Sequence, residues 1–255
     1  RGKTVYTMCS MGTSECITPI LKKPLAEEQI LSWGHPNEPF MEAGVYNTLA
    51  YNVTSGLLSE WAAKVFAARE CQEGRPAYQV LEQEMPQVPT KIMVLPYLHG
   101  SGTPYLDADA RLSLLGMDET ARRGDIYRAI LEGLCMDQRL NIEKLGRDRL
   151  ERAGLLVTGG ASRSRAWLQI KADILDLPIH RLECAQAGAL GCAILCAAAV
   201  GIYPSIKEAA GAMVQVGETV EPRKEESCFY QEKYAVYQTL YETCRKVNAY
   251  AAGDL

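Results

Sequence analysis

The stretch LLVTGGASRSRAWLQIKADILDLPI, residues 155–179, decides the fold class of this chain. It starts as a short apolar run, turns at two adjacent glycines, and continues with Trp167, Ile170 and Ile174 at helical spacing. This order predicts a buried strand over residues 155–157 and an amphipathic helix over 165–175. The glycine turn between them is a place where the main chain can approach a ligand closely.

Two explanations fit the turn at Gly159 and Gly160. An anion could bind the first amides of the helix, which are unpaired and carry the positive end of the helix dipole. Alternatively, Ser162 and Ser164 could cap the same amides, which would leave nothing for a ligand. The spacing alone favours neither explanation.

The rest of the chain alternates strands with helices, which predicts an α/β domain with a mixed sheet flanked by helices. We expect one domain over residues 1–255. The expected elements are a strand, tight turn and strand over 3–20, a helix over 44–69, a loop or small insertion over 72–91, a strand over 91–98, a long helix from Asp125, a strand over 179–182, an interior alanine-rich helix ending near Gly201, and a C-terminal helix whose tyrosines 230, 234, 237 and 241 share one face.

Composition and charge exclude several classes of function. The net charge is −4 with no basic block, which argues against a nucleic-acid or anionic-membrane partner. No signal peptide and no apolar run of membrane length occurs. Nine cysteines are scattered without a C-x-x-C pair, and this usage predicts a cytoplasmic protein rather than a secreted or zinc-binding one.

Three further stretches could carry chemistry. SMGTSE, residues 10–15, could bind phosphate through its amides and hydroxyls, but an ordinary hairpin turn is favoured. Gly56 interrupts a helical pattern, which indicates either close helix packing or a passing ligand. The loop with His99, Asp107, Asp109 and Arg111 could hold a carboxylate pair, although a solvated connector is favoured. The phosphate-binding P-loop, the hydrolase elbow and the dinucleotide fingerprint are all missing.

Taken together and in order, these stretches resemble the carboxy-terminal half of the FGGY carbohydrate kinases, from about Lys3 to Tyr241. The matching motifs are SMGTSE, GVYNTLAYNVTSGLLSEW, PYLHGSGTPYLDADAR, RAILEGLCMDQR, TGGASRSRAWLQIKADILDLPI and AGALGCAILCAAAVGIYPS. The motifs are most similar to those of the xylulokinase-like members, and the segment near residues 70–90 has no matching motif.

The resemblance implies an actin-like ATPase (ribonuclease H-like) domain, with ATP and Mg²⁺ bound between this domain and a second one. It implies that Gly12 and Thr13, with Ser14 in the same hairpin, face the phosphates, and that the phosphate tail passes Gly56. The residues expected to border adenine and ribose are Gly159, Gly160, Ala161 and Ser164.

The resemblance also implies a function for the parent protein. We expect an ATP-dependent sugar kinase that transfers the γ-phosphoryl group to a sugar hydroxyl, with a ketose such as xylulose favoured and glycerol and gluconate left open. The catalytic aspartate and the amino-terminal sugar-binding domain are expected upstream of Arg1, so the isolated chain is expected to be inactive. A homodimer would cover exposed hinge surface. The alternative is a non-catalytic, actin-like nucleotide-binding or regulatory module.

Overall fold

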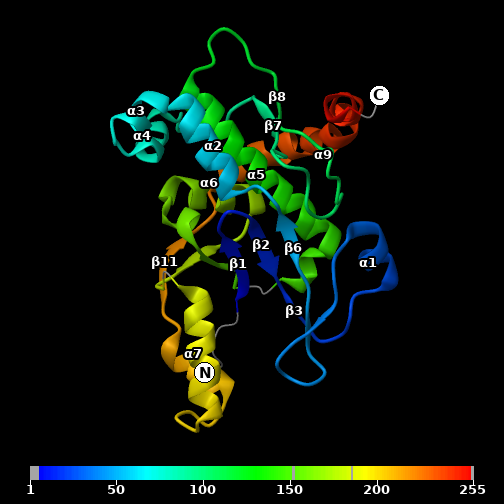
Figure 1. Ribbon diagram of the computed structural model, residues 1–255, viewed down its shortest axis with the longest axis vertical. Coiled ribbons are helices and arrows are strands. Elements are labelled where there is room, and N and C mark those ends of the chain that lie inside the picture. The colour runs from blue at the N-terminus through cyan, green and yellow to red at the C-terminus, as the bar shows by residue number, and fades with distance from the viewer. Residues whose placement is uncertain (1–5, 151–152, 185, 254–255) are drawn as a thin grey trace.

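The computed structural model describes residues 6–150, 153–184 and 186–253 as a mixed α/β domain (Figure 1). Its main sheet has six strands in the order β11-β10-β9-β1-β2-β6. Strands β1, β9 and β10 are parallel, and the other three pair antiparallel to their neighbours. The strand bounds are Thr7–Met11 (β1), Glu15–Thr18 (β2), Ala50–Asn52 (β6), Leu155–Thr158 (β9), Ile179–Leu182 (β10) and Val216–Val220 (β11). The predicted mixed sheet and the β1–β2 hairpin are confirmed, while residues 3–5 lie outside the described part.

Two small sheets and a set of helices complete the described fold. The small sheets consist of β3 (Ile20–Leu21), β4 (Glu38–Pro39) and β5 (Tyr46–Asn47), and of β7 (Met93–Leu95) and β8 (Ser113–Leu115). The helices are α1 (Glu27–Trp33), α2 (Gly56–Phe66), α3 (Ala68–Gln72), α4 (Ala77–Glu84), α5 (Arg123–Leu145), α6 (Arg165–Leu175), α7 (Ala187–Ala199), α8 (Ile206–Met213) and α9 (Lys224–Ala252), with 3-10 turns η1 (Arg147–Arg149) and η2 (Gly160–Arg163).

The long helix α5 lies at the centre of the fold and is buried around almost its whole circumference (Figure 1). It contacts α2, α4, α6 and α9 as well as strands β6 and β7. The sequence predicts a long helix here, and the observed helix buries charged residues such as Glu132 and Asp137 as well as apolar ones. These carboxylates therefore need partners inside the protein.

Asp137 is a carboxyl group held in an environment that favours its neutral form. Its Oδ1 accepts hydrogen bonds from the hydroxyls of Tyr97 at 2.7 Å and Tyr237 at 3.4 Å. Its Oδ2 has no hydrogen-bond partner among the described residues. Burial raises the pKa of Asp137 to about 7, although the two tyrosine hydroxyls act in the opposite direction.

Replacing Asp137 by asparagine should change how stability depends on pH. Between about pH 4 and pH 7 the folded wild type keeps a proton that the unfolded chain releases, so its free energy of unfolding falls as pH rises. The asparagine side chain of the variant would not titrate. We expect the wild type to lose on the order of 3 kcal/mol relative to Asp137→Asn across this range, at about 1.4 kcal/mol per pKa unit. Urea denaturation of both proteins from pH 4 to 8 measures the difference, and parallel stability curves would contradict it.

Two predicted elements near the start of α2 and α4 are wrong. Residues 44–52 do not form the first part of a helix, because residues 50–52 instead pair with β2 as an edge strand. The helix begins only at Gly56, and its buried residues include Leu58 and Ala62. Residues 72–91 are not simply a loop, because they contain α4.

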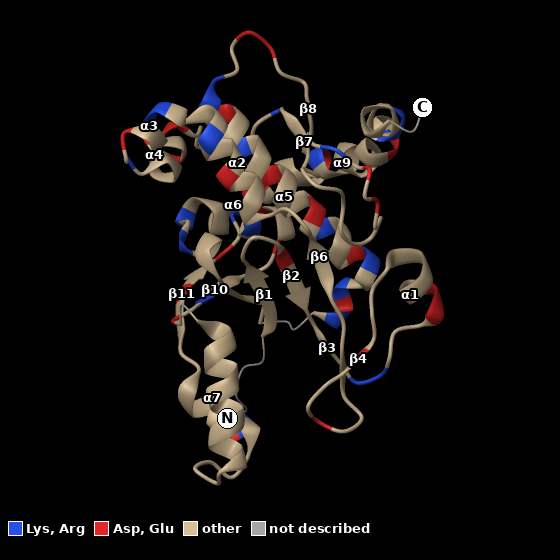
Figure 2. Ribbon diagram, in the orientation of Figure 1, with Lys and Arg blue, Asp and Glu red and all other residues tan. Residues whose placement is uncertain are grey.

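The alanine-rich helix α7 is not an interior helix, contrary to the prediction. Within its bounds only Ile194 and Ala197 are buried, and just beyond its C-terminus Val200 is 71% exposed. Figure 2 shows α7 in tan along its length, because none of its residues is Lys, Arg, Asp or Glu. None of the helices in the described part of the chain has the length and hydropathy of a transmembrane span. By contrast, the predicted tyrosine face of α9 is confirmed, with Tyr230, Tyr234 and Tyr237 buried.

Candidate nucleotide site

Three bends that are far apart in the sequence meet at one end of the main sheet. The turn between β1 and β2 lies on the first residues of α2, where the Gly56 amide donates to the Gly12 carbonyl at 3.0 Å and the Leu57 amide to the Thr13 carbonyl at 3.2 Å. The turn between β9 and α6 packs on the end of β1, since Gly159 lies against the Met11 carbonyl. These main-chain contacts fix the relative positions of all three bends.

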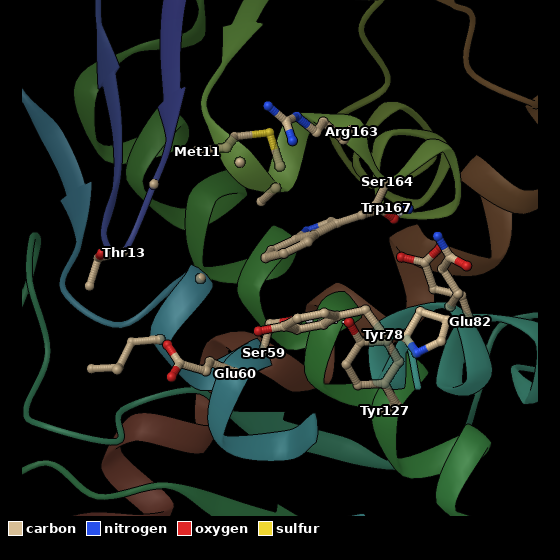
Figure 3. Close-up of a pocket in the computed structure, with 17 residues that line it drawn as sticks. Met11, Thr13, Ser59, Glu60, Tyr78, Glu82, Tyr127, Arg163, Ser164 and Trp167 are labelled. Atoms are coloured by element: carbon tan, nitrogen blue, oxygen red, sulfur yellow. Dashed lines mark hydrogen bonds between the residues drawn. The ribbon is translucent and has the colours of Figure 1, made fainter. Parts of the chain in front are cut away.

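A cavity of about 640 Å³ opens between the three bends (Figure 3). Six of the eight residues expected at the nucleotide line it: Gly12, Thr13, Gly56, Gly160, Ala161 and Ser164. The other two do not. Ser14 supports the hairpin through its carbonyl, which accepts from the Gly12 amide at 2.9 Å, and Gly159 borders a separate hollow of about 350 Å³ beside Arg163 and Arg181.

The glycines of the site serve two different purposes. A Cβ at Gly56 would lie 2.4 Å from the Gly12 carbonyl oxygen, so this position is glycine because two main-chain segments touch. Gly159 has φ +100°, and a Cβ there would lie 2.4 Å from the Met11 carbonyl oxygen. Gly160 is different, because nothing lies within 4 Å of its Cβ position, and it lines both the cavity and the neighbouring hollow. Gly160 therefore leaves space that a ligand could fill.

The capping explanation is confirmed for Ser164 and wrong for Ser162, whose hydroxyl binds a carbonyl instead of a helix amide. Ser164 Oγ accepts the Trp167 amide at 3.0 Å and so caps the N-terminus of α6. Ser162 Oγ donates to the Gly159 carbonyl at 2.7 Å, which closes the turn. Capping does not exclude a ligand here, because Ser164 also lines the cavity.

Part of the cavity is lined by residues outside the quoted motifs, namely those of α4 and its start and Tyr127 of α5. Figure 3 shows Thr13 at one end, and Ser164, Trp167 and Glu82 at the other. The additional lining residues are Met11, Leu57, Ser59 and Glu60 from β1 and α2, Pro76, Tyr78, Gln79 and Glu82 from α4 and its start, Tyr127 from α5, and Arg163 and Trp167 from the region of α6. One end therefore offers backbone groups and the Thr13 hydroxyl, whereas the other offers aromatic rings and the Glu82 carboxylate.

The floor of the aromatic end is rigid, whereas its α2 rim is exposed. Tyr127 and Trp167 are 1% and 2% exposed, and the Tyr127 hydroxyl lies 2.9 Å from Ser59 Oγ. Burial raises the pKa of Tyr127 above its ordinary range, so this hydroxyl stays neutral at physiological pH. The rim includes Glu60, whose Oε1 pairs with Lys64 Nζ at 2.5 Å.

The loop after β7 is a connector, as its sequence favours. Asp107 Oδ2 accepts from the Tyr241 hydroxyl at 2.8 Å, and its Oδ1 accepts the Asp109 amide at 2.8 Å. Arg111 donates to the carbonyl of Ala108 at 2.8 Å. These side chains hold the loop and attach it to α9, and none of them lines the cavity.

The mixed sheet flanked by helices has the actin-like ATPase fold, which the FGGY sugar kinases share. The fold is similar to that of a ligand-bound xylulose kinase from Lactobacillus acidophilus, with a TM-score of 0.82 and 22% identity over 94% of this chain and 47% of that one.

Residues 7–200 match the model of the FGGY family of carbohydrate kinases, C-terminal domain, and the chain belongs to this family of ATP-dependent kinases. It is 27% identical to a xylulose kinase of Staphylococcus epidermidis over 95% of this chain and 48% of that protein. It is 28% identical to a xylulose kinase of Bacillus subtilis over 95% of this chain and 47% of that protein. The chain thus spans about half the length of these relatives.

Proposed function

We propose that this chain is the nucleotide-binding half of an ATP-dependent sugar kinase. The observation that carries the proposal is the cavity between the three bends, whose lining includes Gly160 with no protein atom within 4 Å of its Cβ position. Phosphoryl transfer depends almost entirely on positioning and on stabilising charge, so a rigid cradle for the nucleotide is the main contribution that such a domain makes.

The two unlike ends of the cavity suggest how ATP would lie. Gly12 and Thr13 would face the phosphates, where backbone amides of a turn can bind an anion. Gly160 and Ala161 would lie along the ribose, and Ser164 and Trp167 near the adenine. The chemistry of the cavity fits this group, because apolar rings line one end and polar groups the other.

Magnesium would enter this site with the nucleotide. No group of three or more His, Cys, Asp or Glu side chains in the described ranges is arranged to hold a metal ion. Mg²⁺ keeps several waters and is commonly bound by substrate phosphates with only one or two carboxylates, so the site does not need a cage of protein ligands. Its role would be to neutralise charge on the transferring phosphoryl group.

The substrate that we propose for the complete protein is a ketose such as xylulose, because the relatives described above are xylulose kinases. The sugar-binding domain and the catalytic aspartate would belong to a part of the protein other than this chain. We also propose a cytoplasmic location, because all nine cysteines are free thiols.

Titration with Mg-ADP tests the nucleotide assignment. At 100 times the dissociation constant we expect the free energy of unfolding to rise by about 2.7 kcal/mol, which corresponds to a Tm increase of roughly 5–10 °C. Thermal unfolding with Mg²⁺ alone is the first control. The second is Gly160→Leu, which starts from a Cβ position with no protein atom within 4 Å and adds an apolar side chain to the lining of the cavity. This variant should keep the unliganded Tm but lose the Mg-ADP shift. An equal shift in this variant would place the nucleotide elsewhere.

A further inference from the structure

A buried ion pair lies directly behind the candidate nucleotide site. The Lys171 ammonium donates to Glu15 Oε1, and the Cys9 thiol donates to the same oxygen at 3.3 Å. The Ser55 hydroxyl donates to the other carboxylate oxygen, Oε2, at 3.0 Å. All four residues are 0% exposed, so one carboxylate deep in the protein holds three donors together.

Each partner belongs to an element that carries one of the three bends. Glu15 is the first residue of β2, directly after the hairpin turn. Ser55 immediately precedes Gly56 at the start of α2. Lys171 lies on α6, two turns after Ser164. The Glu15 carboxylate is therefore the point where the three segments that bound the cavity are connected through side chains.

Stability alone does not account for this arrangement. Desolvation of two buried charges can exceed their attraction, and apolar residues of similar volume are often as stable or more so. Burial lowers the pKa of Lys171, but the adjacent Glu15 carboxylate outweighs it and the net pKa is raised, so the Lys171 ammonium stays charged. A charged pair with fixed hydrogen-bond directions restricts geometry more than apolar contacts do.

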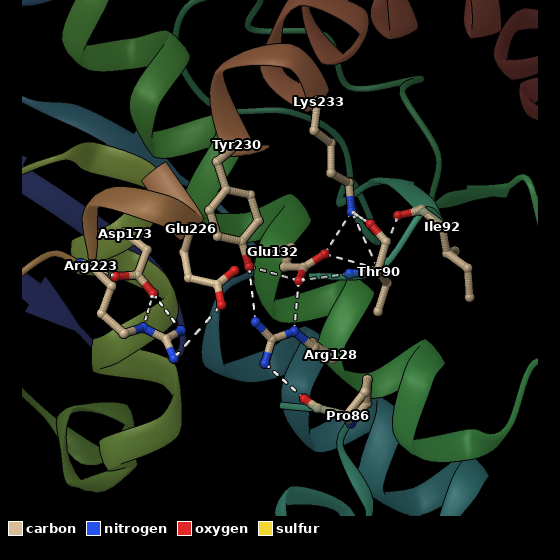
Figure 4. Close-up of polar contacts among 10 residues, drawn as sticks. All are labelled: Pro86, Thr90, Ile92, Arg128, Glu132, Asp173, Arg223, Glu226, Tyr230 and Lys233. Atoms are coloured by element: carbon tan, nitrogen blue, oxygen red, sulfur yellow. Dashed lines mark hydrogen bonds and ion pairs between the residues drawn. The ribbon is translucent and has the colours of Figure 1, made fainter. Parts of the chain in front are cut away.

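A second buried lysine–carboxylate pair provides a comparison (Figure 4). Lys233 Nζ donates to Glu132 Oε2 at 2.6 Å, and the Tyr230 hydroxyl and Arg128 donate to Oε1. This network joins α5, α9 and the segment at Thr90. None of its members lines the cavity. It is a second buried lysine–carboxylate contact without a connection to the bends, and it differs from the first because Arg128 also pairs with Glu132.

We propose that Glu15 and Lys171, with Ser55, are positioning residues that hold the hairpin, the start of α2 and the glycine turn at the separation a nucleotide requires. The inference rests on the proposed function of the cavity. The network acts on the nucleotide only through the bends, because neither Glu15 nor Lys171 lines the cavity.

Lys171→Met and the comparison variant Lys233→Met test this proposal in two measurements. Lys233→Met leaves Glu132 paired with Arg128, so the double variant described below controls for the unpaired charge that Lys171→Met leaves on Glu15. The first is hydrogen exchange of the ligand-free chain, which does not depend on nucleotide binding. Lys171→Met should speed exchange about tenfold or more at the amides of residues 12–14, 56–58 and 160–164, whereas Lys233→Met should act on α9 and the segment near Thr90. The proposal would be overturned if exchange became equally faster throughout the chain in both variants. It would also be overturned if the exchange rates at the three bends were unchanged in Lys171→Met.

The second measurement is the dissociation constant of Mg-ADP at a temperature where both variants are folded. Lys171→Met should bind about tenfold or more weakly, and Lys233→Met within about twofold of the wild type. Normal affinity in Lys171→Met would overturn positioning. Failure of the wild type itself to bind would instead remove the proposed function, with the exchange result still deciding whether the network holds the bends.

A second variant covers the case in which Lys171→Met does not fold. Glu15→Gln/Lys171→Met removes both charges at once, so no unpaired charge remains buried, and the new glutamine side chain can still accept from Ser55. This double variant should fold. Its exchange at the three bends should be faster than in the wild type and its Mg-ADP affinity lower, with both changes smaller than in Lys171→Met. Wild-type exchange at the bends together with wild-type Mg-ADP affinity would show that the ion pair has no positioning role.

Discussion

Gly56→Ala should lower the free energy of unfolding by about 3 kcal/mol or more and weaken Mg-ADP binding at least about tenfold. The new Cβ would lie 2.4 Å from the Gly12 carbonyl oxygen, which cannot move without breaking the hydrogen bond from the Gly56 amide. The hairpin would have to shift away from α2, and with it Thr13. Gly159→Ala should have a similar effect, because it adds an unfavourable φ of +100° to a contact with the Met11 carbonyl.

Gly160→Ala is the matched control for both substitutions. It has open space at its Cβ position and no positive φ, so the free energy of unfolding should stay within about 0.5 kcal/mol of the wild type. Urea denaturation measures stability, and calorimetric titration measures Mg-ADP affinity. If Gly56→Ala were as stable as Gly160→Ala, the direct contact between hairpin and helix would be refuted.

The strand and helix within residues 155–179 could be predicted well because their sequence signals are local. The bounds 165–175 for α6 follow from apolar spacing and from Ser164 as a cap, and both are observed. The convergence of Gly12, Gly56 and Gly160 could not be inferred from any one motif. It followed from the order of several motifs, which is information about a family rather than about local propensity.

The helix α4 was missed because its signals are ambiguous. Ala77, Leu81 and Met85 recur every fourth residue and are all buried, which is a helical pattern. The prolines nearby indicate a loop, yet Pro76 precedes the first helical residue and Pro86 follows the last turn. Proline is tolerated at the edges of a helix, so these residues bound the helix rather than prevent it.

The errors at α2 and α7 arise from tertiary contacts. Residues 50–52 have helical spacing but pair with β2, and Thr54 N donates to Asn52 Oδ1 at 3.1 Å, which turns the chain before the helix. Hydropathy marks α7 as apolar but carries no information about which elements cover it. The contact between Glu15 and Lys171 joins positions 156 residues apart, and no pattern in the sequence relates them.

The purified chain should transfer no phosphoryl group from Mg-ATP to xylulose, glycerol or gluconate above a buffer control. In the proposed function the cavity contacts the nucleotide, while phosphoryl transfer to a sugar would also require a base for the sugar hydroxyl and a surface that holds the sugar. General-base help contributes about 10²–10⁴-fold. Fixing two substrates in one site can contribute an effective molarity of about 10⁵ M or more. Without both contributions, turnover should fall below detection.

A coupled assay of ADP release, run with and without each sugar, measures this activity. The same protein sample must first show the Mg-ADP shift, because otherwise a silent assay would only report a damaged cavity. Sugar-dependent ADP release by the chain alone would contradict the proposal that the base and the sugar site belong to another part of the protein. It would place the base among the residues of this chain, where Glu60 and Glu82 are the carboxylates that line the cavity. If the complete protein bound Mg-ADP but phosphorylated no sugar, a non-catalytic actin-like module would be favoured, since that alternative requires the same cavity and differs only in turnover.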